Sequence, residues 1–327
     1  MNIDVVKEYL GSDWQDVQDA IVSSLQCDID LLNTVNASIL DNSGKQLRPL
    51  LALMVARACS PDGITTRTIN YAAASELLHN ATLLHDDVAD GSLQRRGKPT
   101  VMSLMGPSVS VLVGDYWLVK AMGQILEKAD GNTEVVRLFS KTLSDLAEGE
   151  MLQLQKAQTG DTDENDYLRI IYSKTASLFE VAAVSAAISV NAPLEYIAAV
   201  RDYAVAVGLA FQIKDDILDY SGTESVGKAL GVDILEQKIT MPLLGALSNV
   251  PQEECSRIRA LVNDIVSHPE NRDEIVSFVK NNGGIEYAQK SLDSYISKAV
   301  DALAVLPESV EKSYLEKLAL YTAIRNK

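Results

Sequence analysis

Nearly the whole chain repeats its apolar residues at the spacing of an α-helix. Ala73, Leu77, Ala81, Leu84 and Val88 fall on one helical face. Similar patterns cover residues 13–40, 46–59, 109–128, 133–158, 163–190, 194–220, 240–249, 252–267, 285–305 and 308–325. Clusters of Gly, Pro, Asp and Asn separate these stretches, and alternating strand patterns with hairpin turns are absent. The pattern predicts an all-α fold in a single domain, residues 1–327.

Composition and charge narrow the functional classes. The net charge of −16 argues against nucleic-acid binding, which needs basic surface, and gives no sign of a basic membrane-binding face. The first residues lack a signal-peptide pattern, and no unbroken apolar run reaches the ~20 residues of a membrane helix. Cys27, Cys59 and Cys255 show no CxxC spacing, which is typical of reduced thiols. We therefore expect a cytoplasmic protein without a transmembrane segment.

An aspartate motif that occurs twice is the strongest chemical signal. Asp86-Asp87-Val88-Ala89-Asp90 and Asp215-Asp216-Ile217-Leu218-Asp219 each end a long apolar stretch. Carboxylates at i and i+4 share a helical face, although acidic residues at a helix C-terminus oppose the helix dipole. Two such faces turned towards each other would offer the oxygen ligands of Mg²⁺, which takes further ligands from substrate phosphates. The motifs predict a helical enzyme that grips a diphosphate through magnesium.

Basic residues near the acidic motifs support this hypothesis. Lys45 and Arg48 precede a helix, and Arg95 and Arg96 follow the first motif. Arginine offers a bidentate fork to phosphate, whereas lysine supplies a point charge. Lys174 lies in a helix of small residues, where its side chain either points into a cavity or extends along the surface. Together these cations predict a second anion site beside the metal site.

The spacing of Glu76 and His79 is that of a di-iron helix bundle, E-x-x-H. A di-iron site needs two such motifs, and neither His85 nor His268 has a glutamate at the required spacing. The di-iron interpretation therefore fails. On spacing alone, His79 is equally well a substrate contact or a core histidine with satisfied hydrogen bonds.

These residues belong to a series of ordered motifs over nearly the whole chain. The motifs are GKQLRP (44–49), ELLHNATLLHDDVAD (76–90), RRGKPT (95–100), GDYWL (114–118), EGEMLQ (148–153), KTASLF (174–179), FQIKDDILD (211–219), GKALGVDI (227–234) and KITMP (238–242). In this order they resemble the trans-polyprenyl diphosphate synthases. The resemblance implies an all-α isoprenoid synthase bundle around a central cavity, usually a homodimer. It also implies condensation of isopentenyl diphosphate with an allylic diphosphate, using three Mg²⁺.

The resemblance also implies roles for individual residues. Metal ligation falls to Asp86, Asp90, Asp215 and Asp219, with Asp87 and Asp216 in support. The implied allylic diphosphate contacts are Arg95, Lys174, Thr175, Gln212, Lys228 and Lys238, and the implied isopentenyl diphosphate contacts are Lys45, Arg48, His79 and Arg96. The chain departs from many members at Gly91, where they have an acidic residue, and at Gln237, where they have glycine.

The residues before the first motif bear on product length. At 100° per residue, Thr82, His79 and Ser75 lie closest to the face of Asp86, whereas the family pattern stresses Ala81 and Thr82. Ser75, Ala81 and Thr82 are small and no aromatic plug is present, so we expect a product longer than about twenty carbons. Leu78, Met122, Leu138 and Phe139 are candidates for the cavity floor, with ordinary core packing at least as good an explanation.

Four alternatives compete with this interpretation. A short-chain synthase would share the motifs but make farnesyl or geranylgeranyl diphosphate. A terpene cyclase usually replaces the second aspartate motif by a mixed Asn/Ser/Glu one, and a helical partner subunit of a two-component synthase tends to lose the aspartates. A protein that only binds divalent metal would not need Lys45, Arg48, Arg95 and Arg96.

Overall fold

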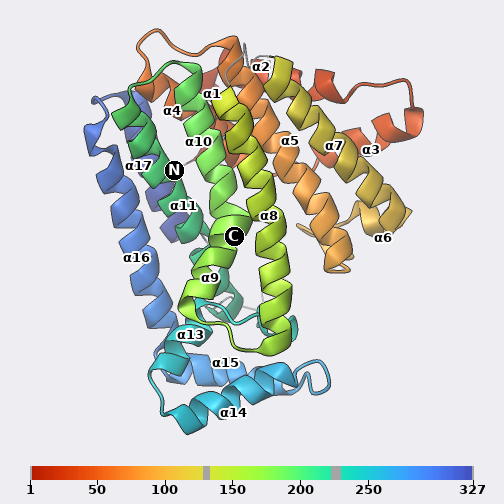
Figure 1. The fold of residues 1–327 in the computed structure, drawn as a ribbon, viewed down its shortest axis with the longest axis vertical. Coiled ribbons are helices and arrows are strands. Elements are labelled where there is room, and N and C mark those ends of the chain that lie inside the picture. Colours follow the sequence, from red (N-terminus) through yellow and green to blue (C-terminus); the bar gives the residue numbers. More distant parts are fainter. Residues whose placement is uncertain (1, 128–132, 222–229, 326–327) are drawn as a thin grey trace. The chain divides into compact units, whose positions relative to one another are not determined.

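The computed structural model describes residues 2–127, 133–221 and 230–325, and these are almost entirely helical (Figure 1). The all-α prediction is confirmed. The α-helices are α1 (Ile3–Leu10), α2 (Ser12–Leu25), α3 (Asp30–Leu40), α4 (Leu47–Cys59), α5 (Thr66–Ala89), α6 (Val101–Met105), α7 (Pro107–Glu127), α8 (Thr133–Thr159), α9 (Glu164–Ile171), α10 (Ser177–Ser189), α11 (Leu194–Ser221), α12 (Val232–Leu235), α13 (Met241–Ser248), α14 (Gln252–Asn263), α15 (Asn271–Asn281), α16 (Gly284–Ala302) and α17 (Val310–Ile324). A π-helical turn, η1 (Tyr172–Ala176), joins α9 to α10, and a 3₁₀ turn, η3 (Leu303–Val305), follows α16.

The described chain forms two compact units, each assembled from three segments of the sequence. Unit 1 contains Met1–Ser140, Val181–Val200 and Val305–Leu315, and unit 2 contains Lys141–Glu180, Arg201–Ala304 and Glu316–Lys327. The helices α8, α10, α11 and α17 each contribute residues to both units. The first aspartate motif belongs to unit 1 and the second to unit 2.

Unit 1 is organised around α5, which carries the first aspartate motif. A capping box formed by Thr65 and Thr68 begins this helix, because each side chain accepts from the other residue's backbone N–H. The helix packs along α7, beside which it lies in Figure 1, and also against α4 and α2. Tyr71 and Trp117 are fully buried in this unit. The last turn of α5, with Asp90 as its C-cap, then holds the motif.

In unit 2, the helices α8 and α11 both pack closely against the π-helical turn η1. A Cβ on Gly149 of α8 would lie 2.5 Å from the Cβ of Ser173, and one on Gly208 of α11 would lie 2.5 Å from the Cα of Ala176. Only glycine permits such contacts, so both positions let their helices lie directly against the turn. The turn carries Lys174, and α11 carries the second aspartate motif, so these approaches bring the two together.

Several predicted boundaries were wrong. The stretch 13–40 forms two helices, because the backbone is extended at Gln26 and Ile29, between α2 and α3. The stretch 163–190 contains η1, and α14 ends before residue 267. The helices α1 and α15 were not predicted, since each buries only three apolar side chains. The expectation of no hairpin was also wrong.

That hairpin consists of β1 (Gln94–Arg95) and β2 (Lys98–Pro99), which pair antiparallel. Arg96 and Gly97 form its two-residue turn with φ of 54° and 76°. Positive φ at both positions is typical of the tight turns that join antiparallel strands. The strands are too short to show alternation in the sequence, which is why the pattern did not reveal them.

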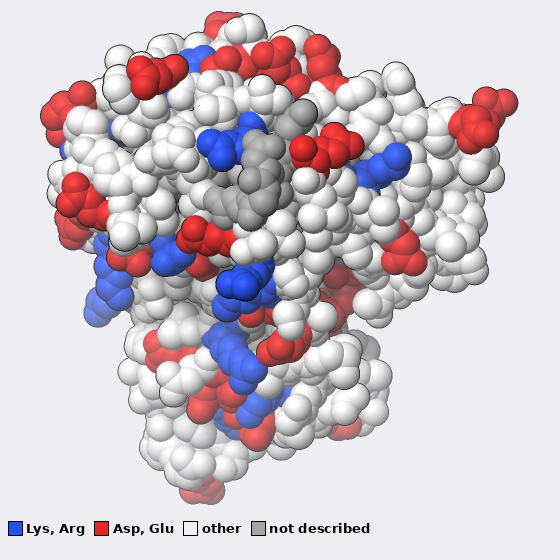
Figure 2. Space-filling view, turned by 45° about the horizontal axis from the view of Figure 1, so that its top comes forward, with Lys and Arg blue, Asp and Glu red and all other residues white. Residues whose placement is uncertain are grey.

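Two helices, Pro107–Glu127 and Leu194–Ser221, are long and apolar enough to cross a membrane by length and composition alone. Core helices of soluble proteins pass the same test. More than half of the 18-residue apolar segment of α11 is buried, against one third of the corresponding segment of α7. On the face drawn in Figure 2, acidic and basic side chains are interspersed. This face does not present the broad basic field that nucleic-acid binding requires.

Candidate active site

The three aspartates of the first motif have different environments. Asp87 is buried and accepts a hydrogen bond from Nε of Arg95 at 2.8 Å, whereas Asp86 is half-buried and Asp90 exposed. Burial raises the pKa of the Asp87 carboxyl, and the charge of Arg95 opposes that shift. Asp87 therefore holds the loop that follows α5, while Asp86 and Asp90 share a more accessible face.

A basic cluster in unit 1 consists of Arg48, His79 and Arg96. Arg48 comes from the first turn of α4, His79 from α5 and Arg96 from the hairpin turn. Arg96 donates from Nη1 to the carbonyl oxygen of Asn42 at 2.8 Å. Its guanidinium would lie only 2.4 Å from a Cβ at Gly44, so this glycine makes room for it. Lys45 is exposed at the edge of the same loop.

The basic cluster lowers the pKa of His79 and contains a buried acidic residue, Glu76. Burial first, and then the charges of Arg48 and Arg96, hold the pKa of His79 well below its usual range. Glu76, 2% exposed, accepts from Nδ2 of Asn80 at 3.2 Å. Burial raises the pKa of Glu76 and lowers that of Arg48 to about 10, and the attraction between the two residues opposes both shifts. A neutral imidazole beside arginines can donate a hydrogen bond to an anion.

In the second motif Asp216 is held entirely by side chains of its own unit. The hydroxyl of Tyr167 donates to Oδ2 at 2.5 Å, and Nε2 of Gln212 donates to Oδ1 at 3.0 Å. Burial, followed by the charge of Asp233, raises the pKa of Asp216 well above its usual range. Asp216 thus lies in the interior as a structural anchor, in contrast to the metal ligands predicted on either side of it.

The other two aspartates of this motif have cationic or backbone partners. Asp215 forms an ion pair with Arg325, and Asp219 accepts from the backbone N–H groups of Val232 and Asp233 at 3.1 Å and 3.2 Å. Burial and the nearby charge of Asp219 raise the pKa of Asp233 to about 7. The helix α12 is therefore attached directly to the second motif.

The turn η1 links the predicted diphosphate lysine to the second motif. Nζ of Lys174 lies 2.5 Å from Oε2 of Glu150 and 3.1 Å from Oε1 of Gln153. The hydroxyl of Thr175 donates to Oε1 of Gln212 at 3.0 Å, and Gln212 in turn donates to Asp216. A continuous chain of hydrogen bonds therefore runs from the turn into α11.

Lys238 forms an ion pair with Glu236 in the loop after α12. The intervening Gln237 has a φ of 57°, the left-handed conformation that explains why glycine suits this position. Its side chain donates to the carbonyl oxygen of Asn263 at 2.8 Å. The predicted contact Lys228 lies outside the described residues.

The donor set fits a hard divalent cation completed by substrate. Within the described residues, no group of three His, Cys, Asp or Glu side chains is arranged to hold a metal on its own. Mg²⁺ is usually bound through one or two carboxylates, with phosphates and waters supplying the other ligands. Asp86 and Asp90 of unit 1, and Asp215 and Asp219 of unit 2, could each supply such a carboxylate pair.

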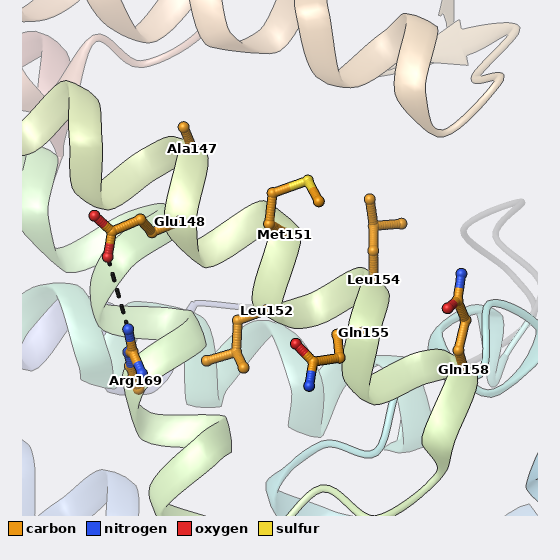
Figure 3. Close-up of a pocket in the computed structure, with 8 residues that line it drawn as sticks. All are labelled: Ala147, Glu148, Met151, Leu152, Leu154, Gln155, Gln158 and Arg169. Atoms are coloured by element: carbon orange, nitrogen blue, oxygen red, sulfur yellow. Dashed lines mark ion pairs between the residues drawn. The ribbon is translucent and has the colours of Figure 1, made fainter.

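A groove of about 580 Å³ in unit 2 lies along α8 and α9 (Figure 3). It is lined by Ala147, Glu148, Met151, Leu152, Leu154, Gln155, Gln158 and Arg169. None of the predicted site residues that the structure describes is among them. Arg169 and Glu148 form an ion pair of 3.6 Å at one end, as Figure 3 shows. Met151 and Leu154 are exposed, and the neighbouring Glu150 contacts Lys174.

The residues predicted to control product length lie along α5 in unit 1. Ser75, Leu78 and Ala81 are buried, and Thr82 is half-buried with its hydroxyl donating to the carbonyl oxygen of His79. Met122 and Leu138 are half-buried. Phe139 is fully buried and lies against Tyr71, with ring centroids 6.5 Å apart.

Several residues in these networks were not predicted, among them Glu76, Glu150, Tyr167, Asp233 and Arg325. Glu76, Glu150 and Asp233 occur inside motifs quoted above, so their acidic side chains were available as a signal. Tyr167 and Arg325 lie outside every motif, and only the structure connects them to the second aspartate motif.

An all-α chain with two helix-ending aspartate motifs, each beside cations, defines an isoprenoid-diphosphate enzyme of the prenyl-transferring class. A family model described as polyprenyl synthetase matches residues 29–280. The chain is 36% identical to octaprenyl diphosphate synthase of Haemophilus influenzae over 327 residues, covering 100% of this chain and 98% of that protein.

Solved structures agree with this match. A decaprenyl diphosphate synthase from Rhodobacter capsulatus has a TM-score of 0.92 and 34% identity and covers 100% of both chains. A polyprenyl synthase from Caulobacter crescentus, complexed with calcium and isoprenyl diphosphate, has a TM-score of 0.90 and 31% identity, covering 100% of this chain and 98% of that one. The protein belongs to the polyprenyl synthetase family and is a transferase, as the motifs predicted.

Proposed function

We propose that this protein is a magnesium-dependent, cytoplasmic trans-polyprenyl diphosphate synthase that condenses isopentenyl diphosphate with an allylic diphosphate. The observation that carries the proposal is the pairing of each helix-ending aspartate motif with cations in its own unit. Arg95 contacts the first motif, and Lys174 is followed directly by Thr175, whose hydroxyl is linked to the second motif through Gln212. Three Mg²⁺ per site would complete the arrangement.

The reaction needs charge stabilisation and no protein nucleophile. The allylic C–O bond breaks and diphosphate leaves, the double bond of isopentenyl diphosphate forms the new C–C bond, and a proton is then lost to the departing diphosphate. Bound metal would stabilise the charge that develops on the leaving group. Lys174 and Arg95 would exchange their carboxylate partners for the diphosphate, and the neutral His79 would donate to the second substrate.

The two anion sites can be separated by their substrates. We expect Arg96→Ala to raise KM for isopentenyl diphosphate more than for the allylic substrate, and Lys174→Ala to do the reverse. A charged hydrogen bond to phosphate is worth roughly 1.5–3 kcal/mol, so shifts of about tenfold or more should appear. Steady-state kinetics with each substrate varied in turn measure both values. Equal effects of both variants on both substrates would refute the assignment.

Product length follows from the residues between Tyr71 and Asp86. Tyr71 is the first aromatic residue before the motif on α5, four helical turns away. One turn rises about 5.4 Å, close to the reach of one isoprene unit. Four turns correspond to about four isoprene units, so no aromatic side chain of α5 would stop growth before about twenty carbons. We expect a longer product, of roughly thirty to forty carbons.

The exposed face of α7 supports the proposal of a homodimer. Leu112, Val119 and Leu126 are 69%, 67% and 57% exposed and recur every seven residues. Apolar residues at this spacing form the stripe along which a helix packs against a second helix. Only one third of the apolar window of α7 is buried within the chain, so a second copy of this chain is the occupant that we propose.

We expect Leu112→Glu/Val119→Glu to convert a wild-type dimer to monomer in sedimentation velocity. Val266→Glu, at an exposed apolar residue of unit 2, is the matched control and should stay dimeric. A wild-type monomer, or a double variant that stays dimeric, would refute the α7 interface. Vesicle flotation of the wild type would identify a membrane as the occupant instead.

Incubation of labelled isopentenyl diphosphate with farnesyl diphosphate and Mg²⁺, followed by product sizing, tests the proposed function. Chain elongation that EDTA abolishes supports it. Cyclic hydrocarbons without use of isopentenyl diphosphate would indicate a terpene cyclase. Products limited to fifteen or about twenty carbons would indicate a short-chain synthase, and activity only after addition of another subunit would indicate a two-component enzyme.

A further inference from the structure

The end of the chain places an arginine in the second aspartate motif. Nη2 of Arg325 lies 2.9 Å from Oδ1 of Asp215 and donates to the carbonyl oxygen of Phe211 at 2.7 Å. The guanidinium carbon lies 3.8 Å from the centroid of the Phe211 ring. Arg325 follows α17 and lies outside residues 29–280, so neither the motifs nor the family match pointed to it.

Three contacts therefore hold one buried guanidinium. The Arg325 side chain is 4% exposed, whereas that of Asp215 is 44% exposed. A buried cation needs a paired anion, and Asp215 provides it. The exposed remainder of the same carboxylate is where a divalent cation would bind, close enough to feel the charge of the guanidinium.

The positive charge of Arg325 matters because Asp215 lies among other acidic residues. Asp216 and Asp219 lie on the same last turns of α11 as Asp215, and Asp233 donates its backbone N–H to Asp219, so several carboxylates lie close together and repel one another. Arg325 offsets part of that repulsion. A divalent cation would offset the same repulsion. Because Arg325 already offsets part of it, the motif gains less electrostatic free energy from binding the cation.

We propose that Arg325 is the built-in counter-cation of the second aspartate motif. It holds Asp215 in position and lowers the affinity of this motif for a divalent cation alone, so that tight metal binding requires the negative charge of a diphosphate. The inference rests on the proposed function, because it takes Asp215 and Asp219 as metal ligands.

Mn²⁺ alone, without substrate, is the probe. An Asp86→Ala/Asp90→Ala background restricts the signal to the second motif. In this background Arg325→Gln is compared with Arg325→Lys, which keeps the charge, and with a chain that ends at Arg325. Thermal unfolding is measured in EDTA and in Mn²⁺, and Mn²⁺ binding is measured by isothermal titration calorimetry.

We expect Arg325→Gln to lower Tm in EDTA, to gain more Tm from Mn²⁺ than its parent, and to bind Mn²⁺ about three- to tenfold more tightly. Arg325→Lys and the chain that ends at Arg325 should resemble the parent. A Tm loss of the same size with and without Mn²⁺, or unchanged or weaker Mn²⁺ binding, would overturn the inference. A metal role for the motif predicts that the parent responds to Mn²⁺ and that Asp215→Ala removes this response. If it does not, the proposed metal role of the motif itself fails.

Discussion

Asp86→Ala is expected to lower kcat/KM by about a thousandfold or more with little change in stability. The variant removes a metal ligand at the point where charge develops, and such electrostatic losses are among the largest in catalysis. Asp86 is half-buried near two other carboxylates, so its removal relieves repulsion rather than creating a cavity. Kinetics at saturating Mg²⁺, together with thermal unfolding, separate loss of chemistry from loss of fold.

The exposed Asp62 gives a matched control, since Asp62→Ala removes an acid of the same unit away from the motif. Near-native turnover of the Asp86 variant would refute the metal role. For Asp219 the better test is Asp219→Asn, because alanine would also remove the acceptor for the N–H groups of α12, at a cost of about 1 kcal/mol. Asparagine keeps an acceptor, so we expect inactive protein with nearly native Tm.

Thr82→Phe is expected to shorten the product to fifteen or about twenty carbons while metal-dependent activity remains. Thr82 precedes Asp86 by one helical turn on the same face and is half-buried, so a phenyl ring would project across the path of the growing tail. Product sizing by reversed-phase chromatography of the dephosphorylated alcohols measures the change.

Thr82→Ser is the control for Thr82→Phe and should keep the parental length. The family pattern also points to Ala81, but Ala81 is fully buried, so a phenyl ring there must displace its neighbours. We expect that variant to shorten the product too, but with a loss of stability that Thr82→Phe does not show. An unchanged product length in Thr82→Phe would refute this path, whatever the fate of the chemistry.

Helix periodicity predicted the fold well where an apolar stripe is long. The helix α5 and the placement of the first motif at its end were visible in the spacing of its apolar residues. Short helices such as α15 were missed because Ile275, Phe278 and Val279 span little more than one turn. The break after α2 was missed because extended backbone at Gln26 has no glycine or proline to mark it.

The residue types of the site could be predicted, but not their partners. Aspartates and basic residues in ordered motifs indicated diphosphate chemistry. Nothing in those motifs distinguished the buried Asp216, held by Tyr167, from the more exposed Asp215, held by Arg325. These partners come from distant segments of the chain; Tyr167, for example, lies 49 positions before Asp216. Sequence spacing carries no information about such pairs.

One regular helix could not meet both the direction that Lys174 needs and the register in which α10 packs. The π-helical turn at Tyr172–Ala176 allows both. It inserts one residue into the helical count, so the direction of Lys174 is set independently of the register in which α10 packs. Deleting Ala176, which follows Lys174 in this turn, would leave a continuous α-helix of almost unchanged composition. It would also rotate everything before the deletion by about 100° relative to α10. The lysine would then leave Glu150 and Gln153, although every residue type of the site would still be present.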